Sequence, residues 1–255
     1  MGLFFLFETI IQHWFIISLF FIIALLYSSV GFGGGSSYLA VLALTGIAYT
    51  QIRSTALLCN IIVVSGNVFL YVQQKQYNWR KVIPLVVFSI PLAFIGGFLK
   101  ISETFFFVLL GITLLFAAIT MWLSKKITAS KEINIQKNAA YGGVIGFISG
   151  MVGIGGGIFL APLLHLTNWD SPKKIAATAS FFILVNSISG LIGQYTNPTF
   201  TIDWNLTSIL LVTVLIGGQI GSRLSNKLFT PIQLKKATAI LIAFVSIRIL
   251  IKYLL

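Results

Sequence analysis

Two matching stretches, VGFGGGSSYLAVLALT at residues 30–45 and VGIGGGIFLAPLLHLT at residues 152–167, decide the fold of this chain. Each interrupts an apolar segment with four glycines in five positions and then starts a short apolar arm. They align residue for residue at a constant shift of 122 positions, and further on STA at residues 54–56 falls opposite TAS at residues 178–180. The chain is therefore internally duplicated. Hydrophobic segments interrupted at matching places in two halves are typical of secondary transporters.

The composition places the chain in a bilayer rather than in water. Of its 255 residues, 57% are hydrophobic and 9% are charged, and the mean hydropathy is +0.99. A soluble domain carries about a quarter charged residues, so a soluble globular fold is excluded. The net charge of +12 comes from cations in short stretches between apolar segments, where basic loops orient membrane proteins. We therefore expect the lipid bilayer, and no nucleic acid, as a partner. The single cysteine, Cys59, excludes an internal disulfide and a cysteine-built metal site.

Apolar runs of suitable length predict an all-α, polytopic membrane protein made of two repeats. We expect a first membrane repeat at residues 1–123, a basic cytoplasmic linker at 124–138 and a second membrane repeat at 139–255. Each repeat contains one glycine-broken hairpin segment and three spanning helices. The expected apolar segments cover residues 14–30, 38–47, 54–72, 82–99, 104–123, 139–152, 158–167, 175–195, 206–224 and 232–255. An interfacial aromatic belt is expected from the tryptophans near segment ends, Trp14, Trp79, Trp122, Trp169 and Trp204.

The distribution of Lys and Arg distinguishes two arrangements of the repeats. If each broken segment crosses the membrane once, the repeats are parallel and the cations divide 9 to 8 between the two sides. If each broken segment folds back at its glycines, the repeats are inverted and the division is 13 to 4. The four are Arg53, Lys100, Arg248 and Lys252. Because cytoplasmic loops carry the excess of cations, we expect inverted repeats with both termini outside the cytoplasm.

The glycine breaks are the first candidate for a binding site. Such a run leaves backbone N–H groups without helical partners, and within a membrane these groups must be satisfied by protein, cavity water or a ligand. A helix that starts after each break would direct its positive N-terminal end at the loop, which attracts an anion. The glycines expected to contact a small anionic substrate are Gly33, Gly34, Gly35, Gly155, Gly156 and Gly157. The alternative is that the glycines only permit a tight bend. By contrast, Gly142, Gly146 and Gly150, spaced by four residues, favour close helix packing.

Polar side chains inside the apolar segments form the second candidate group, because lipid cannot satisfy them. The expected substrate-binding residues among them are Ser36, Ser37, Asn60, Thr178, Ser180, Asn186 and Gln194. Since Ser and Thr also bond to their own helix backbone, the amides are the stronger candidates. Arg53 lies at the mouth of its segment, where it either draws anions inward or marks a loop end. His165 either carries a coupling proton or packs near the interface.

The sequence resembles the sulfite exporter TauE/SafE family of membrane transporters, also called the TSUP family, over nearly the whole chain. The resemblance rests on both glycine breaks, on the STA and TAS triplets and on the Gly-Gly pairs that begin at Gly96 and Gly217. Pro162 follows the second break as it usually does in the family, whereas the first half has Ala40 at that place. The resemblance implies transport of a small sulfur-containing oxyanion, such as sulfite, sulfoacetate or another organosulfonate, across a bacterial cytoplasmic (inner) membrane.

The expected mechanism is alternating access, in which the two repeats rock around the paired glycine loops. The alternatives are an anion channel and, less in keeping with the loops, a non-transporting receptor or assembly protein. An enzyme is not expected, because the sequence has no HExxH motif, no paired carboxylates and no serine with a plausible buried base. No cofactor and no metal are expected. The carboxylates all fall at segment ends or in loops: Glu8, Glu103, Glu132, Asp170 and Asp203.

Overall fold

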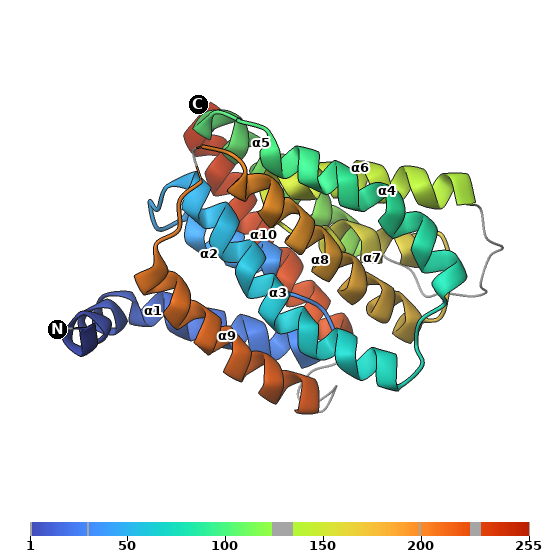
Figure 1. Ribbon diagram of the computed structural model, residues 1–255, viewed down its shortest axis with the longest axis horizontal. Helices are drawn as coiled ribbons and strands as arrows, with labels where there is room; N and C mark the ends of the chain where they lie inside the picture. The colour runs from blue at the N-terminus through green and yellow to red at the C-terminus, as the bar shows by residue number, and fades with distance from the viewer. Residues whose placement is uncertain (1, 30, 124–134, 199, 225–230, 255) are drawn as a thin grey trace.

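The computed structural model describes residues 2–29, 31–123, 135–198, 200–224 and 231–254, and every regular element in these ranges is an α-helix (Figure 1). The helices are α1 (Gly2–Ser29), α2 (Gly35–Ala43), α3 (Tyr49–Gln73), α4 (Trp79–Phe98), α5 (Glu103–Leu123), α6 (Ile135–Val152), α7 (Gly157–Leu166), α8 (Pro172–Tyr195), α9 (Trp204–Leu224) and α10 (Pro231–Leu254). In this described part, six helices are long and apolar enough to cross a membrane, namely α1 from Glu8 onward, α3, α4, α5, α8 and α9. The expected all-α, multi-spanning fold is confirmed.

Short polar signals set where several helices begin. The side chain of Asp203 accepts hydrogen bonds from the backbone N–H groups of Asn205 (3.0 Å) and Leu206 (3.3 Å) at the start of α9. Ser102 accepts one from the N–H of Phe105 (3.2 Å) at the start of α5, and Pro172 occupies the first turn of α8. Such caps satisfy N–H groups that have no partner within the helix, and proline at this position lacks one altogether.

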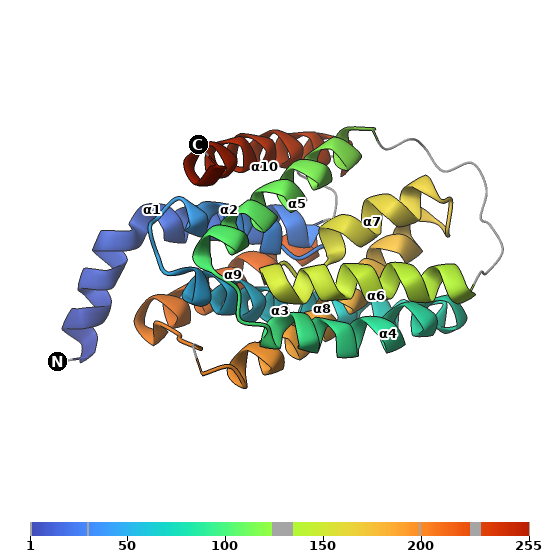
Figure 2. The ribbon, with the colours of Figure 1, turned by 90° about the horizontal axis from the view of Figure 1, so that it is seen from above.

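The chain reverses direction at each glycine break (Figure 2). Across the first break, Phe20 of α1 stacks on Tyr38 of α2 with ring centroids 4.6 Å apart. Across the second, Trp169, just beyond α7, donates from Nε1 to Oδ1 of Asn138 near the start of α6 (3.3 Å). With 9 and 10 residues, α2 and α7 rise only about 14–15 Å and cannot cross a bilayer alone. Each broken segment therefore folds as a hairpin.

Glycines allow the closest helix contacts. A Cβ at Gly142, Gly146 or Gly150 of α6 would collide with a backbone carbonyl oxygen of α4. Gly217 and Gly221 of α9 lie in the same way against carbonyl oxygens of α1. Small residues let two backbones approach in a membrane, where dispersion contacts rather than water exclusion hold helices together. The predicted packing role of the three α6 glycines is confirmed.

Equivalent helices of the two halves make equivalent contacts, both between the halves and within each half. α1 packs on α9 whereas α6 packs on α4, and α2 packs on α3 whereas α7 packs on α8. α5 and α10 pair with each other, and α3 and α8 pair in the centre. Figure 1 shows α3 and α8 running in opposite directions. These two helices form the scaffold on which the candidate site is built.

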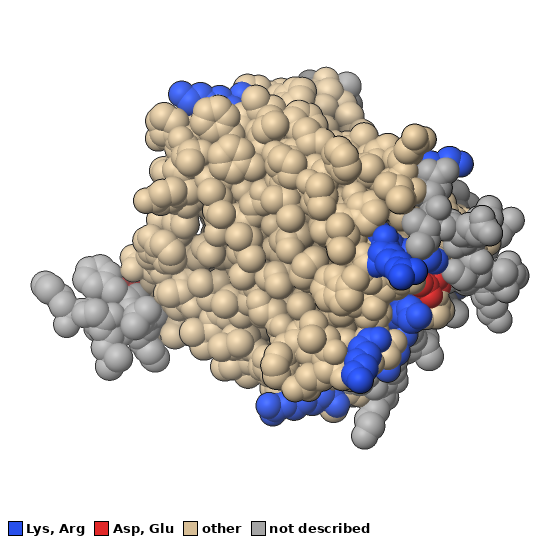
Figure 3. Space-filling view, turned by 45° about the vertical axis from the view of Figure 1, so that its right-hand side comes forward, with Lys and Arg blue, Asp and Glu red and all other residues tan. Residues whose placement is uncertain are grey.

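The sides of the bundle are apolar and the cations lie at its ends. Large side chains such as Phe116, Val212 and Phe244 are 57–59% exposed, as expected for a surface that faces lipid. Most of the Lys and Arg drawn in Figure 3 gather toward one end of the molecule. We call it the Lys81 end; its described cations are Lys75, Arg80, Lys81, Lys137, Lys173, Lys174, Arg223 and Lys236. The opposite, Arg53 end has Arg53, Lys100, Arg248 and Lys252. Residues 124–134, most of the expected linker, lie outside the described residues.

The tryptophans differ in their surroundings. Trp14, Trp79, Trp122 and Trp204 are 45–63% exposed, as an interfacial belt requires. Trp169 is only 7% exposed, so the expectation that it belongs to the belt is wrong. It lies inside the bundle because it packs against α4 and α6 at the Lys81 end.

Candidate functional site

The two glycine breaks meet at the side chain of Asn60, in the middle of α3. Asn60 donates from Nδ2 to the carbonyl oxygen of Ile154 in the second break (2.9 Å). A Cβ added at Gly33 in the first break would lie 2.8 Å from Asn60 Oδ1, and one at Gly155 would lie 2.9 Å from Nδ2. A Cβ at Gly35 would overlap with the same amide. One buried amide therefore touches both halves of the duplication, and glycine is required where they converge.

The breaks leave a run of unpaired backbone donors. Each begins with a local turn, in which Gly31 N–H donates to Ser28 O (3.0 Å) and Gly153 N–H donates to Ser149 O (2.7 Å). Beyond these turns, no acceptor among the described residues receives the N–H groups of residues 33–35 or 155–157. Gly155 and Gly156 have φ of +82°, a left-handed conformation that L side chains rarely adopt. The backbone at the centre thus presents donors instead of side chains.

Two helices begin at this centre. α2 follows Gly34 and α7 follows Gly156, and neither N-terminus has a side-chain cap. The positive ends of both helix dipoles consequently point at the Asn60 region, where uncapped N–H groups favour an anion. We call this set the cradle: residues 33–35 and 155–157 with Asn60.

Several polar atoms around the cradle are buried without a protein partner. Asn60 Oδ1 and Ser187 Oγ have none among the described residues, and Ser187 Oγ would lie 2.8 Å from a Cβ at Gly155. Ser149 Oγ is also unpartnered, and the Ser149 Cβ lies 3.3 Å from a Cβ at Gly156. Buried polar atoms are usually satisfied, so an unpaired group calls for an explanation such as a bound ligand.

The predicted hydroxyl residues divide between the cradle and its supports. Ser36 and Ser37 occupy the first turn of α2 and are buried, and the Ser37 hydroxyl lies 2.7 Å from that of Tyr27. Ser180 donates to the carbonyl oxygen of Gly31 and so holds the first break against α8. Thr178 is buried on α8, and its Oγ1 has no partner in the described part of the chain.

Among the described residues, no hydrogen bond joins the side chain of Asn186 or Gln194 to the glycine breaks. Asn186 Nδ2 donates to Phe182 O of its own helix (2.8 Å), and Asn186 Oδ1 lacks a partner among the described residues. Gln194 lies near the end of α8, in a pocket that it shares with Arg53. Arg53 is 4% exposed and donates from one guanidinium nitrogen to Gly97 O (3.4 Å) and Gly150 O (3.3 Å). It is therefore a buried cation rather than the mark of a loop end.

His165 is also remote from the cradle. It occupies the last turn of α7, eight residues after Gly157, which corresponds to about 12 Å along the helix. His165 is partly buried and has an interaction partner. The structure thus places it toward the Lys81 end, away from the paired breaks.

Sequence reasoning overlooked a regular pattern of polar side chains on α3 and α8. Arg53, Asn60 and Asn67 recur every seven residues on α3, and Ser180, Ser187 and Gln194 do so on α8. Residues seven apart lie on one helix face, two turns from each other. Arg53 shares a pocket with Gln194, and a Cβ at Gly155 would touch both Asn60 and Ser187. These contacts fix an antiparallel register of α3 and α8. Asn67 contacts α1, where its Oδ1 accepts a hydrogen bond from Ser28 Oγ (3.2 Å). The repeated spacing was the signal that could have identified Ser187 and Asn67.

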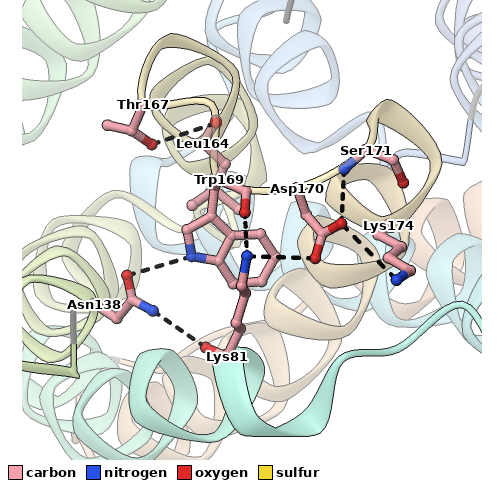
Figure 4. Close-up of polar contacts among 8 residues, drawn as sticks. All are labelled: Lys81, Asn138, Leu164, Thr167, Trp169, Asp170, Ser171 and Lys174. Carbon is pink, nitrogen blue, oxygen red and sulfur yellow. Dashed lines mark hydrogen bonds and ion pairs between the residues drawn. The ribbon is translucent and has the colours of Figure 1, made fainter. Parts of the chain in front are cut away.

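A second overlooked group closes the Lys81 end (Figure 4). Lys81 of α4 is 6% exposed and donates to Trp169 O (2.5 Å), and its ammonium group lies 3.6 Å from the carboxylate of Asp170, which is 8% exposed. Trp169 donates to Asn138, whose amide in turn contacts Lys81 O (3.5 Å). Lys174 lies 3.9 Å from Asp170. The network joins the N-terminal ends of α4, α6 and α8. Asp170 lies in a loop as expected, yet it is a buried ion-pair partner.

Comparisons with known proteins agree with this architecture. The family model described as "Sulfite exporter TauE/SafE" matches residues 16–249. A "Probable membrane transporter protein" of Sinorhizobium fredii is 33% identical, covering 91% of this chain and 95% of its own length. Similarly named proteins are 25% identical in Methanocaldococcus jannaschii (82% of this chain, 84% of its own) and 26% identical in Bacillus subtilis (84% and 91%). No solved structure matches the chain significantly. The matched residues include both glycine breaks and the helices that hold them, and the chain belongs to the sulfite exporter TauE/SafE family of membrane transporters.

Proposed function

We propose that this multi-pass membrane transporter is a secondary transporter that moves a small sulfur-containing oxyanion across a bacterial cytoplasmic membrane. The proposed substrates are sulfite, sulfoacetate and other organosulfonates. The family description supports this class. The single observation that carries the proposal is the convergence of both glycine breaks on Asn60. There the N-terminal ends of α2 and α7 present backbone donors to one buried point.

The chemistry of the cradle suits an oxyanion. Backbone N–H groups donate to several oxygens at once, and sulfite and sulfonate groups each carry three. Each helix N-terminus stabilises a negative charge by about 0.3–1 kcal/mol, and by up to about 2 kcal/mol in a partly buried site. The cradle contains no cationic side chain. We therefore expect the solute to bind weakly enough to be released quickly. Asn60 Oδ1 and Ser187 Oγ accept from a protonated oxygen or from water that accompanies the solute.

Alternating access follows from the proposed inverted repeats, residues 1–123 and 139–255, joined by the cytoplasmic linker 124–138. Two observations support this arrangement. Helix α1 packs on α9 as its counterpart α6 packs on α4, and α3 runs antiparallel to α8. Rocking of one repeat against the other would expose the cradle to each side in turn. We assign the Lys81 end to the cytoplasm because it carries the excess of cations. Both termini then lie outside.

Transport into proteoliposomes tests the proposal. Purified protein is reconstituted, and uptake of labelled sulfite, sulfoacetate and taurine is measured with and without a pH gradient. We expect uptake of sulfite and sulfoacetate to saturate and to show counterflow. Taurine carries an ammonium group, which the positive helix ends repel, so its uptake should be weaker. Uptake that rises linearly without counterflow would identify a channel instead. Absence of uptake for both anions would refute the substrate class.

A further inference from the structure

A second polar pocket lies at the Arg53 end of the α3–α8 interface. It is a small pocket that opens to the surface, and it is lined by Thr50, Arg53, Gly97, Gln194, Asn197 and Phe200. We call it the Arg53 pocket. Two of its side chains, Arg53 and Gln194, are each only 4% exposed, although both carry strong hydrogen-bond donors.

Donors in this pocket exceed the acceptors available to them. Arg53 Nε and Gln194 Nε2 have no acceptor among the described residues. The two contacts of the Arg53 guanidinium with carbonyl oxygens are long, at 3.3 and 3.4 Å. Within the described residues, no carboxylate lies within 4.0 Å of the guanidinium. A buried cation is costly unless it is paired, and the missing partner here has the chemistry of an anion that accepts several hydrogen bonds.

The pocket is aligned with the cradle. Arg53 precedes Asn60 by seven residues on α3, and Gln194 follows Ser187 by seven residues on α8, so the two levels are about 10 Å apart. A Cβ at Gly153, at the start of the second break, would lie 3.1 Å from the backbone of Arg53. The start of the second break therefore packs against the backbone of the residue that carries the guanidinium. Asn67 lies seven residues beyond Asn60 on α3, toward the Lys81 end, and its Nδ2 is again unpartnered within the described chain.

We propose that the Arg53 pocket is a second anion site, in which Arg53 and Gln194 bind a small oxyanion before it passes along the α3–α8 interface to the cradle. The guanidinium and the amide donate to the oxyanion oxygens, and Thr50 and Asn197 line the mouth. Binding at the pocket stands on its own geometry, whereas the passage to the cradle rests on the proposed function.

Equilibrium binding to the purified full-length protein in lipid-free detergent tests the site. Sulfite and sulfoacetate are titrated calorimetrically into wild type, Arg53→Gln, Arg53→Lys and Gln194→Met. Lys100→Gln is the matched control, because it removes an exposed cation at the same end. Gly35→Ala tests the cradle separately. Thermal midpoints confirm that each variant is folded, and counterflow in proteoliposomes is measured on the same preparations.

Wild type should bind at two sites. Arg53→Gln should weaken binding at one of them at least about tenfold, since a hydrogen bond to a charged group is lost, and Gln194→Met should weaken the same site. Arg53→Lys, which keeps the charge, should weaken it less. Lys100→Gln should bind like wild type, and Gly35→Ala should lose the other site. Equal losses in Lys100→Gln and Arg53→Gln, or wild-type binding in both Arg53→Gln and Gln194→Met, would overturn the site.

Two further outcomes separate this inference from the proposed function. If Gly35→Ala retains full counterflow while Arg53→Gln loses its site, the cradle is wrong and the pocket stands. A phospholipid headgroup carries the same anionic oxygens, so a short-chain phosphatidylglycerol is added as a competitor. If this lipid occupies the pocket and sulfite does not displace it, the site belongs to a lipid and the inference fails.

Discussion

Replacing Gly35 by alanine tests the cradle with the smallest possible change. Gly35 is the first residue of α2 and has a helical backbone, so alanine introduces no conformational strain there. Its Cβ would nonetheless overlap with the Asn60 amide and would lie 2.6 Å from the carbonyl oxygen of Ile154. The methyl group therefore has to displace the amide that joins the two breaks.

The expected magnitude follows from these contacts. Loss of the hydrogen bond from Asn60 to Ile154 O costs about 0.5–1.5 kcal/mol, and overpacking a filled interior costs about 1–3 kcal/mol. A stable protein tolerates this loss. Binding of the solute should weaken more, because the added methyl group stands among the backbone donors of the cradle. Loss of one hydrogen bond to a charged group costs about 1.5–3 kcal/mol, a tenfold to hundredfold rise in the half-saturation concentration. Counterflow of sulfite and sulfoacetate in proteoliposomes measures the rise, and thermal unfolding in detergent measures the stability.

Gly46→Ala is the matched control. Gly46 has φ of +74° and nothing lies within 4 Å of an added Cβ. Alanine there pays about 1–2 kcal/mol of backbone strain without touching the cradle. We expect a lowered unfolding midpoint with unchanged counterflow. The reasoning is refuted if Gly35→Ala transports like wild type, or if Gly46→Ala loses transport to the same extent.

Three other outcomes are expected. Lys81→Met should destabilise the protein by about 3–5 kcal/mol in denaturant unfolding, because it leaves Asp170 buried without its closest cation. The double variant Lys81→Met/Asp170→Leu should recover most of this lost stability. If it recovers none, the ion-pair explanation is wrong. Gly146→Ala, whose Cβ would lie 2.6 Å from an α4 carbonyl oxygen, should lower the thermal midpoint, whereas Gly66→Ala meets only a flexible glutamine at 3.1 Å and should not. Cys59 is 0% exposed, so a membrane-permeant maleimide should label it only after unfolding, and labelling of the native protein would show that α3 is not packed as described.

The positions of the helices could be predicted because the bilayer imposes a local rule. A spanning helix needs about 20 apolar residues, and charges or breakers end it, so α4 and α9 lie within a few residues of the expected segments. The roles of Gly142, Gly146 and Gly150 were equally readable from their spacing of four. Anion binding at the breaks stays a prediction, which rests on the excess of glycine over what a bend needs.

The grouping of the polar residues could not be predicted. Gln194 was expected as a substrate-binding residue, but only the structure shows that it shares a pocket with Arg53. Asp170 lies in a loop as expected, but only the structure shows that it is buried against Lys81. The seven-residue spacing marks Ser187 as part of a polar helix face, but only the structure shows that Ser187 lies beside Gly155. In each case the partners are more than 25 residues apart in the sequence, where no periodicity connects them.

By itself, the sequence determined that this protein is a duplicated bundle of membrane helices, each half broken once by glycines. That much follows because lipid forces every backbone group within a spanning segment to find its partner nearby. Only the tertiary structure decided that the two breaks meet at Asn60 and that α3 and α8 run antiparallel with Arg53 beside Gln194. Those contacts depend on how surfaces of distant helices fit together, which the order of residues along one helix does not specify.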